Sequence, residues 1–521
     1  MAGDGWRRNG VDDWSVEDAR DFLGTVLGHE VQPSDFPQFP PGTGAAPRAI
    51  HDALSRHIAL VNEANPSYLT RRSVWECLTV LCCFVAWAGG YFARDHILVS
   101  QQDFCERERI SRQEFAAMMA VGYACYCTGK VVFGLVADSF GGCGTLLFTL
   151  LGSAVLSIVF SFGSGSPLYF IVVYGFLRFT QAAGWVGIVR VVGAWVPSTR
   201  HGRVMSFLSL SFLIGDTVVR SILSEVLQAG YSWREVVRFC AVCTALFAVP
   251  VVIIIRDSPL SKGIQPPPRP PSSVCLYDDQ QAKPSMRTIL GPLCSSFSFW
   301  MLCMLSFLVA SIRELFNVYS VPYLESLGKE PDKAASMSSL FPGFGVVGVV
   351  VIGVTVDWLG GRELWRLRSC AIPMWGAFAL PGLAALAMWP SPSFWPLSAA
   401  FMSAGFGVCG LFSLLAGVLS LDLGGQYGSA TVCGITDAAG YLGAMAIMAA
   451  SGTLSSDFQT LFGVATVLCC GCILVGCAFV CTSGREYAAL IEADRPGSEM
   501  AAVVGASTEQ RDLGAMENHV E

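Results

Sequence analysis

Twelve apolar stretches, separated by polar segments, divide the chain. Each is roughly 18–25 residues long, enough for an α-helix to cross the hydrocarbon core of a bilayer. The first six cover about 75–99, 113–136, 144–163, 167–192, 205–228 and 236–255, and the second six about 298–322, 336–356, 369–389, 395–419, 428–450 and 458–481. The pattern predicts an all-α polytopic membrane protein with twelve transmembrane helices.

Three longer polar segments set the domain organisation. Residues 1–72 are rich in proline, glycine and charge, 256–297 contain a proline-rich run, and 482–521 are polar and acidic. Such compositions are typical of tails and linkers rather than packed cores. We predict a disordered N-terminal tail over 1–72, six-helix bundles over 73–255 and 298–481, a linker over 256–297 and a C-terminal tail over 482–521.

Basic residues predict the orientation. If twelve spans alternate, most of them fall on the side that holds the linker and both termini: Arg71, Arg72, Arg200, Arg203, Lys262, Arg269, Lys283, Arg287, Arg362, Arg366 and Arg368. Cytoplasmic loops carry such an excess, so we predict cytosolic termini and a cytosolic linker. The exceptions lie in the first loop on the other side, where acids accompany Arg107, Arg109 and Arg112.

Two arginines stand inside apolar stretches. Arg94, followed by Asp95, lies in 75–99, and Arg313, followed by Glu314, lies in 298–322, 219 positions later. An arginine at the centre of a membrane helix costs about 2.5–3.5 kcal/mol on insertion scales, so one that is kept usually faces a cavity, a partner or a ligand.

An internal repeat has the same offset. Residues 129–142 and 348–361 share four glycines, two valines and an aspartate in one register, with Gly134 and Asp138 matching Gly353 and Asp357. Transporters built from two such copies bind substrate near the midplane, where the copies meet. We therefore expect Arg94 and Arg313 to face each other across that interface.

Two guanidinium groups in one cavity favour an anion, because each can grip a phosphate or carboxylate with paired hydrogen bonds. The alternative is that each arginine is paired structurally, for example with Asp216, Glu225 or Asp437. The acids Asp95 and Glu314 need not enter the cavity, since neighbours on a helix point about 100° apart.

Composition narrows the function classes. The chain is 53% hydrophobic and only 14% charged, with a mean hydropathy of +0.53. The sequence has no basic stripe that would suggest binding of nucleic acid. It also shows no pair of nucleophile and base, no nucleotide-binding loop and no metal-binding cluster, so we expect neither an enzyme nor a cofactor or metal. Most of the 20 cysteines lie in apolar stretches, where they act as small hydrophobic residues.

The repeated glycine and aspartate loop resembles the loop signature of the major facilitator superfamily, although Ser139 and Trp358 replace its usual basic residue. Within that superfamily the chain resembles the organophosphate:phosphate antiporters. The stretches that carry this likeness are 91–94, Arg178 to Trp195 (including Gln181, Gly184, Trp185 and Arg190), Arg256 to Pro267, Ile312 with Arg313, and Pro322 to Leu324.

The resemblance implies that Arg94 and Arg313 bind the substrate phosphate and that Lys130, Tyr91 and Tyr126 line the site. Alternatively, Lys130 snorkels toward an interface and the tyrosines only pack. The glycerol-phosphate members carry a lysine where this chain has Asp95 and a histidine where Phe212 aligns. Asp437 matches no obvious family position.

We therefore predict a monomeric carrier that exchanges a sugar phosphate or glycerol phosphate for inorganic phosphate by alternating access. Asp95, Glu314 and Asp437 are candidates for coupling or selectivity; for Asp437 the options are a proton or an ion pair with an arginine. Two alternatives remain open: a proton- or sodium-coupled carrier of a carboxylate or amino acid, and a transport-inactive membrane sensor. The sequence does not specify which membrane holds the protein.

Overall fold

The computed structural model describes residues 68–267, 286–359, 368–388, 393–454 and 458–493. Most of both predicted tails, residues 268–285 of the predicted linker and the last glycines of the second repeat copy lie outside these residues. Within them, twelve helices are long and apolar enough to cross a membrane. The predicted all-α fold with twelve transmembrane helices is confirmed.

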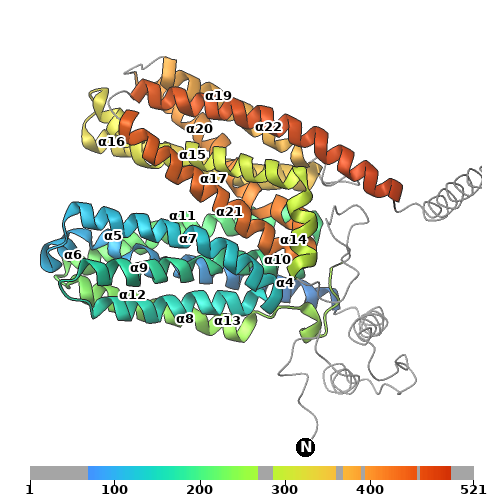
Figure 1. The fold of residues 1–521 in the computed structure, drawn as a ribbon, viewed down its shortest axis with the longest axis horizontal. Coiled ribbons are helices and arrows are strands. Elements are labelled where there is room, and N and C mark those ends of the chain that lie inside the picture. The colour runs from blue at the N-terminus through green and yellow to red at the C-terminus, as the bar shows by residue number, and fades with distance from the viewer. Residues whose placement is uncertain (1–67, 268–285, 360–367, 389–392, 455–457, 494–521) are drawn as a thin grey trace, which may run out of the picture.

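The helices form two bundles (Figure 1). The N-terminal bundle consists of α4 (Tyr68–Gly89), α5 (Phe92–Val99), α6 (Gln101–Glu108), α7 (Arg112–Phe140), α8 (Gly142–Ser161), α9 (Pro167–Gln181), α10 (Ala183–Trp195), α11 (His201–Gln228), α12 (Trp233–Leu246) and α13 (Ala248–Ile254). The C-terminal bundle consists of α15 (Phe297–Ser326), α16 (Pro331–Ser338), α17 (Leu340–Leu359), α19 (Ala371–Met388), α20 (Phe394–Ser413), the π-helix η5 (Leu414–Leu419), α21 (Ser420–Leu454) and α22 (Phe458–Ala493).

Short helices occupy the two ends of the molecule. One end, here called the linker end, holds two helices of the predicted linker, α14 (Met286–Ser295) and the 3-10 helix η4 (Pro259–Lys262), close to the start of α4. The opposite end, here called the loop end, carries α6 and α16. Past the last predicted span, α22 continues to Ala493.

Several predicted spans are interrupted. The first, expected as one helix over 75–99, breaks between α4 and α5 at Gly89–Tyr91. A β-carbon at Gly89 would lie 2.3 Å from the ring of Phe247, so only glycine allows this approach. The tenth span passes from α20 into η5, and the eleventh begins beyond a kink at Gly425, whose φ is 56°.

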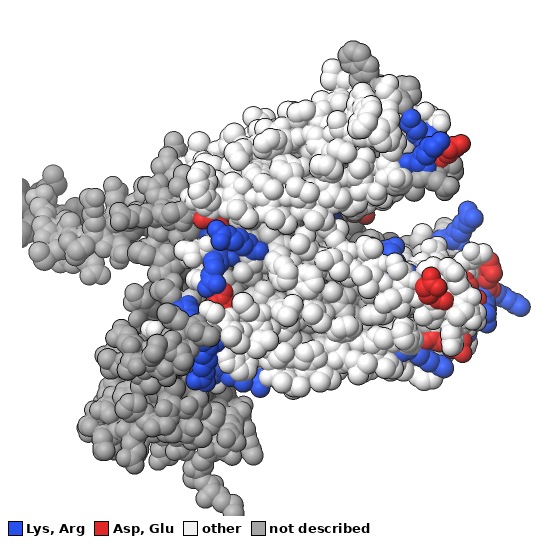
Figure 2. All heavy atoms as spheres, turned by 180° about the vertical axis from the view of Figure 1, so that it is seen from behind, with Lys and Arg blue, Asp and Glu red and all other residues white. Residues whose placement is uncertain are grey.

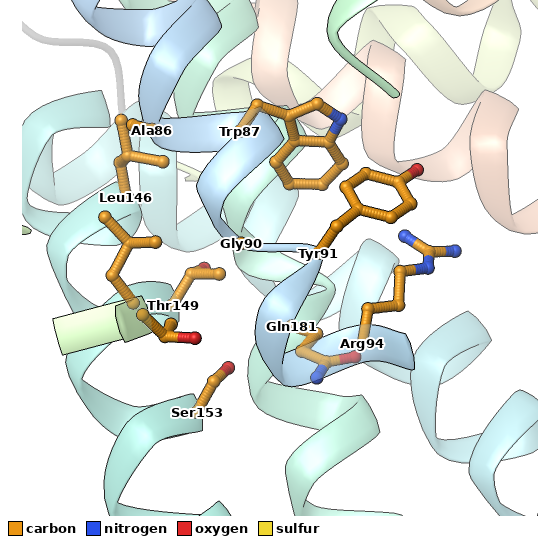
Figure 3. Close-up of a pocket in the computed structure, with 11 residues that line it drawn as sticks. Ala86, Trp87, Gly90, Tyr91, Arg94, Leu146, Thr149, Ser153 and Gln181 are labelled. Atoms are coloured by element: carbon orange, nitrogen blue, oxygen red, sulfur yellow. The ribbon is translucent and has the colours of Figure 1, made fainter. Parts of the chain in front are cut away.

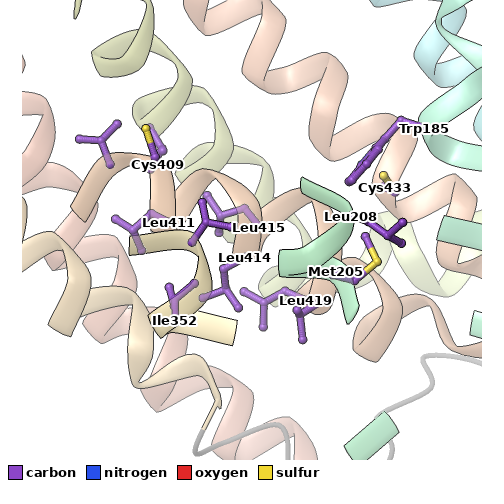
Figure 4. Close-up of a cluster of buried hydrophobic side chains, with 14 of the residues drawn as sticks. Trp185, Met205, Leu208, Ile352, Cys409, Leu411, Leu414, Leu415, Leu419 and Cys433 are labelled. Carbon is purple, nitrogen blue, oxygen red and sulfur yellow. The ribbon is translucent and has the colours of Figure 1, made fainter. Parts of the chain in front are cut away.

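Buried apolar side chains from both bundles share one cluster near η5 (Figure 4). Trp185, Met205 and Leu208 come from the N-terminal bundle, and Leu415 and Leu419 from η5. Full burial of a large apolar side chain in water-soluble proteins is worth roughly 1.5–3 kcal/mol. In a bilayer that drive is weaker, so close packing holds such contacts together.

The bundles are joined at the linker end and separated at the loop end, where Figure 2 shows a notch between them. At the joined end Gly202 of α11 approaches Gly353 of α17 so closely that an added β-carbon would lie 2.3 Å from the carbonyl oxygen of Gly353. The structure is therefore closed toward the linker and open toward the loops.

Candidate functional site

A central cavity lies between the two bundles, and the empty space between its walls, part of it open to solvent, is about 580 Å³. Its lining residues from the N-terminal bundle are Trp87, Tyr91, Arg94, Tyr126, Lys130, Trp185, Ser209 and Phe212, and those from the C-terminal bundle are Arg313, Phe412, Ser413, Ala416, Asp437 and Tyr441. All five residues predicted to bind substrate are among them. The repeat-related arginines thus line one space, one from each bundle, as the 219-residue offset predicted.

Arg94 projects from α5 just after the break in the first span. Its Nη2 donates a hydrogen bond to the hydroxyl of Tyr441, 3.3 Å away on α21. Its guanidinium carbon lies 5.4 Å from the ring centroid of Tyr91 and 5.3 Å from that of Tyr126. Aromatic faces attract a guanidinium without neutralising it, so its charge stays available to an anion.

Arg313 has comparable surroundings in the other bundle. Its guanidinium carbon lies 4.4 Å from the ring centroid of Phe412 and 5.4 Å from that of Phe212. Within the described part of the chain, neither Arg94 nor Arg313 forms an ion pair with a carboxylate. The alternative that each arginine is paired with an acid is not what the structure shows.

Tyr126 of α7 is surrounded by three cations. Arg94, Lys130 and Arg178 place their charged groups 5.3, 5.2 and 4.9 Å from the centroid of its ring. The ring also packs edge-on against Tyr441 at 4.8 Å. Tyr126 therefore separates positive charges that would otherwise face one another directly.

Lys130 and Asp437 form an ion pair across the two bundles. The Nζ of Lys130 on α7 lies 2.7 Å from Oδ2 of Asp437 on α21, and both side chains are buried. Lys130 therefore does not snorkel toward an interface. The partner expected for Asp437, if it was ion-paired, was an arginine; the structure gives it the lysine instead.

The cavity has an excess of positive charge. Three basic residues and one acid line it, Arg94, Lys130 and Arg313 against Asp437, so its formal charge is 3 − 1 = +2. A phosphate monoester carries about −1.5 to −2 at neutral pH, which complements that charge.

The fourth span fixes the backbone next to Arg94. Gln181, the last residue of α9, donates from Nε2 to the carbonyl oxygen of Ala93 at 2.7 Å, and its Oε1 accepts from Arg178 at 2.9 Å. The backbone beside Arg94 is thereby fixed, although the span is broken there. The stretch quoted for the family likeness thus has a structural task next to the cavity.

Another stretch of that likeness packs against the end of the fourth span. The indole of Trp195 donates to the carbonyl oxygen of Arg256 at 2.6 Å, and the Asp257 carboxylate accepts from the backbone N–H of Cys143 at 2.8 Å. The chain leaving the sixth span is therefore fastened to the rest of the N-terminal bundle.

Asp95 and Glu314 do not line the cavity. Asp95 faces Arg220 of α11, with 3.5 Å between Oδ1 and Nη2. Glu314 accepts a hydrogen bond from Asn317 on its own helix at 3.3 Å. Of the three coupling or selectivity candidates, only Asp437 reaches the cavity, so Asp95 does not reduce the charge of the cavity wall.

The repeated loop motif, for which the sequence suggests a gating role, lies where the bundles join; its residues are Gly134, Asp138, Gly353 and Asp357. Asp138 accepts hydrogen bonds from the backbone N–H groups of Ala430 at 3.2 Å and Thr431 at 2.7 Å on α21. An added β-carbon at Gly134 would lie 2.7 Å from the carbonyl oxygen of Ala430, so this glycine allows the close approach.

The second copy makes the equivalent contact in the opposite direction. Asp357 accepts from the N–H groups of Gly202 at 2.7 Å and Arg203 at 2.9 Å, at the start of α11. Arg368 lies beside it, bound to both oxygens of Asp422 at 2.8 and 2.7 Å and to the carbonyl of Ser198 in the other bundle. Each repeat thus places a carboxylate at a helix N-terminus of the other bundle, where the helix dipole favours negative charge.

A second pocket, of about 370 Å³, lies inside the N-terminal bundle on the far side of the break (Figure 3). Gly90, Thr149, Ser153 and Gln181 line it together with Arg94. Arg94 therefore lines both this pocket and the central cavity.

The sequence did not identify Tyr441, Phe412 and Ser413 as site residues. Tyr441 lies one helical turn beyond Asp437, and that spacing places both on one face of α21. The available signal was thus the intramembrane acid. Phe412 and Ser413 carry no charge and follow no repeat, so no pattern marked them.

Three comparisons with known proteins agree with this architecture. The sequence model of the Major Facilitator Superfamily matches residues 79–381. The glycerol-3-phosphate transporter of Bacillus subtilis is 24% identical over 405 residues, which cover 75% of this chain and 88% of that protein. The membrane sensor protein UhpC of Salmonella typhimurium is 22% identical over 380 residues, 72% of this chain and 84% of that protein.

A similar fold occurs among solved structures. A bacterial homologue of the iron transporter ferroportin superposes with a TM-score of 0.60 at 14% identity, over 78% of this chain and 98% of that one.

Among the residues that the structure describes, no group of three or more histidine, cysteine or acidic side chains is placed to hold a metal ion.

Proposed function

Because the chain belongs to the Major Facilitator Superfamily, we propose that it carries an organic phosphate across a membrane in exchange for inorganic phosphate. Membership in a family of transporters confirms the predictions of a multi-pass integral membrane protein and of a protein that is not an enzyme. The resemblance to organophosphate:phosphate antiporters agrees with the glycerol-3-phosphate transporter found among its relatives.

One observation carries the proposal: Arg94 and Arg313, one from each bundle, line the same cavity and are not ion-paired with acids among the described residues. A phosphate between them would accept hydrogen bonds from both guanidinium groups and so attract the bundles toward each other. An empty cavity would leave two like charges facing each other. Closure would then need a bound anion, which favours exchange over an empty return.

The other lining residues have supporting tasks in this proposal. Tyr91 and Tyr126 hold the cations apart, and Lys130 adds positive charge that Asp437 balances. Apolar and aromatic walls from Trp87, Trp185 and Phe212 suit the carbon part of a small phosphate ester.

We propose that the linker end faces the cytosol and that the carrier acts as a monomer. Arg200, Arg203 and Arg368 gather at the linker end. At the loop end Arg107 pairs with Asp103 at 2.6 Å, and Arg234 with Glu108 at 2.7 Å. Of the three basic residues that break the charge rule, Arg107 is thereby paired with an acid.

Counterflow in proteoliposomes tests the proposal. Vesicles loaded with unlabelled phosphate should accumulate radiolabelled phosphate, and external glycerol phosphate or a sugar phosphate should compete. Arg94→Lys and Arg313→Lys should each lower the rate by about 10- to 100-fold, because lysine keeps the charge but loses the paired hydrogen bonds. Arg112→Lys, at the exposed start of α7, is the matched control.

The transport-inactive sensor is the second candidate, because one relative is described as a membrane sensor protein. Binding of phosphate without counterflow would favour it. Uptake of a carboxylate or amino acid that is driven by a proton or sodium gradient and unaffected by phosphate would contradict both the antiporter and the sensor.

A further inference from the structure

Behind the cavity, two carboxyl groups share one guanidinium. Asp95 of α5 lies against Asp216 and Arg220 of α11. We propose that Asp95 and Asp216 bind one proton between them, and that this proton site is linked to anion binding at Arg94. The link rests on the proposed function of the cavity, whereas the proton site does not.

Arg220 binds the carboxylate of Asp216 more closely than that of Asp95. Its Nη2 and Nε lie 2.8 and 2.9 Å from Oδ1 of Asp216, whereas Asp95 Oδ1 is 3.5 Å from Nη2. Asp95 is only 2% exposed, and its Oδ2 has no hydrogen-bond partner. A buried acceptor without a donor costs about 1–3 kcal/mol, and more when it is charged.

Counting charges gives the same result. Two ionised carboxylates and one guanidinium would leave the cluster with a net charge of −1, and the cost falls on Asp95, the buried member, where an uncompensated charge is expensive. The positive charge of the neighbouring Arg94 also acts on Asp95, but its guanidinium lines the cavity and forms no ion pair with Asp95 among the described residues. The other titratable side chains that act on Asp95, from Tyr91, Tyr174 and Cys240, are neutral hydroxyl and thiol groups. His96, next in the chain, is engaged with Ser157 of α8. A proton taken from water would form an O–H bond on Asp95, cancel the net charge and supply the missing donor toward Asp216.

Water can reach this cluster from the loop end. Phe212 lines the cavity, and Asp216 and Arg220 follow at one-turn intervals on the same face of α11, farther toward the loops. Their side chains are 39% and 48% exposed. The bundles separate toward this end of the molecule, where Figure 2 shows the notch. Closure of the loop end would cover this face, so the proton would enter and leave on the open side.

The local backbone connects this cluster to the anion site. Arg94 and Asp95 are consecutive residues of a short helix that begins after the break at Gly89–Tyr91. Gly215 of α11 packs directly on Ala88 and Tyr91, where an added β-carbon would lie 2.9 Å from Ala88. A movement of Arg94 toward a phosphate therefore shifts Asp95 relative to Asp216 and Arg220.

The repeat provides a matched control. Glu314 occupies the position equivalent to Asp95, 219 residues later, and it accepts a hydrogen bond from Asn317 on its own helix. If the proton site depends on the cluster rather than on an acid beside an intramembrane arginine, it belongs to the N-terminal bundle alone.

Infrared difference spectroscopy on the purified full-length protein tests the proton site without any transport. Between acidic and alkaline buffer, the wild type should show a carboxylic-acid C=O band that Asp95→Asn removes and Glu314→Gln keeps. Addition of inorganic phosphate should shift the band in the wild type. A band that survives Asp95→Asn, or that is lost in Glu314→Gln instead, would overturn the proposal.

Counterflow of phosphate against pH tests the link. Above the midpoint of the pair, the wild-type rate should fall by about tenfold per pH unit, as for a single proton, whereas Asp95→Asn, which mimics the protonated acid, should lack this component. Both proteins see the same titration of phosphate itself, so the comparison isolates the pair. Identical pH profiles of the two proteins would contradict the link. A change in rate when choline replaces sodium in the buffer would contradict it as well. The band without counterflow in any protein would retain the proton site and reject the proposed function.

Discussion

The contact between Lys130 and Asp437 is a single ion pair that crosses from one bundle to the other within the central cavity. Its atoms lie 2.7 Å apart, and both side chains are almost entirely buried. Two buried charges lose their hydration, and only a close partner compensates for that loss. In the proposed function, an incoming anion would compete with Asp437 for the lysine, while Arg94 and Arg313 would remain available.

Removing one partner of this pair should be worse than removing both. Lys130→Gln and Asp437→Asn should each lower the free energy of unfolding by about 3–5 kcal/mol, because each leaves an uncompensated buried charge. The double variant should recover part of that loss. Thermal unfolding in detergent measures the three variants, and strictly additive effects would show that the two side chains do not depend on each other.

At the scale of helices, α7 and α21 approach closely through small residues. A β-carbon at Gly434 would lie 2.3 Å from the carbonyl oxygen of Lys130, and one at Gly134 would lie 2.7 Å from that of Ala430. Small residues let membrane helices pack backbone to backbone, which is a main source of association in lipid. This contact holds the linker end closed.

Gly434→Ala should therefore push α7 and α21 apart. Overpacking of this kind costs about 1–3 kcal/mol, and we expect a lower unfolding temperature together with a linker end that opens more readily. Gly463→Ala on α22 is the matched control, because no atom lies within 4 Å of its added β-carbon. A gain in stability from Gly434→Ala, as helix propensity alone would give, would contradict the packing.

The sequence predicted the number and placement of the helices because hydropathy and length report directly on the bilayer. It did not predict the break before Arg94, which requires the Phe247 ring to pack on Gly89, a contact between distant parts of the chain. The π-helix η5 was missed for a similar reason. The carbonyl oxygen of Ala416 there accepts from Trp185 at 3.4 Å and from Cys433 at 3.1 Å, two residues on other helices.

At the scale of the whole molecule, the repeat predicted more than any single motif. One offset placed Arg94 and Arg313 in one cavity and put Asp138 and Asp357 at equivalent contacts. It could not predict Tyr441 or the lysine partner of Asp437, because neither is duplicated. Residues that are duplicated in both copies can be placed by the repeat symmetry. The contacts of residues that differ between the copies depend on how the two bundles pack against each other.

The two carboxylates that cross the linker end should set the balance between its closed and open forms. Asp138 and Asp357 each accept two backbone hydrogen bonds from the other bundle, at Ala430 and Thr431 and at Gly202 and Arg203. A hydrogen bond to a charged group contributes about 1.5–3 kcal/mol, so Asp138→Asn or Asp357→Asn should shift the balance toward the open form by about 10- to 100-fold.

Hydrogen–deuterium exchange can follow this shift at the amides concerned. In Asp138→Asn, peptides that contain Ala430 and Thr431 should exchange faster, and in Asp357→Asn those that contain Gly202 and Arg203. Asp103→Asn is the matched control, because Asp103 accepts from the Trp233 N–H at 2.8 Å at the other end and within one bundle. Unchanged exchange in both gate variants would mean that apolar packing alone holds the linker end closed. Faster exchange there in Asp103→Asn would mean that the bundles loosen as a whole and do not open at one end.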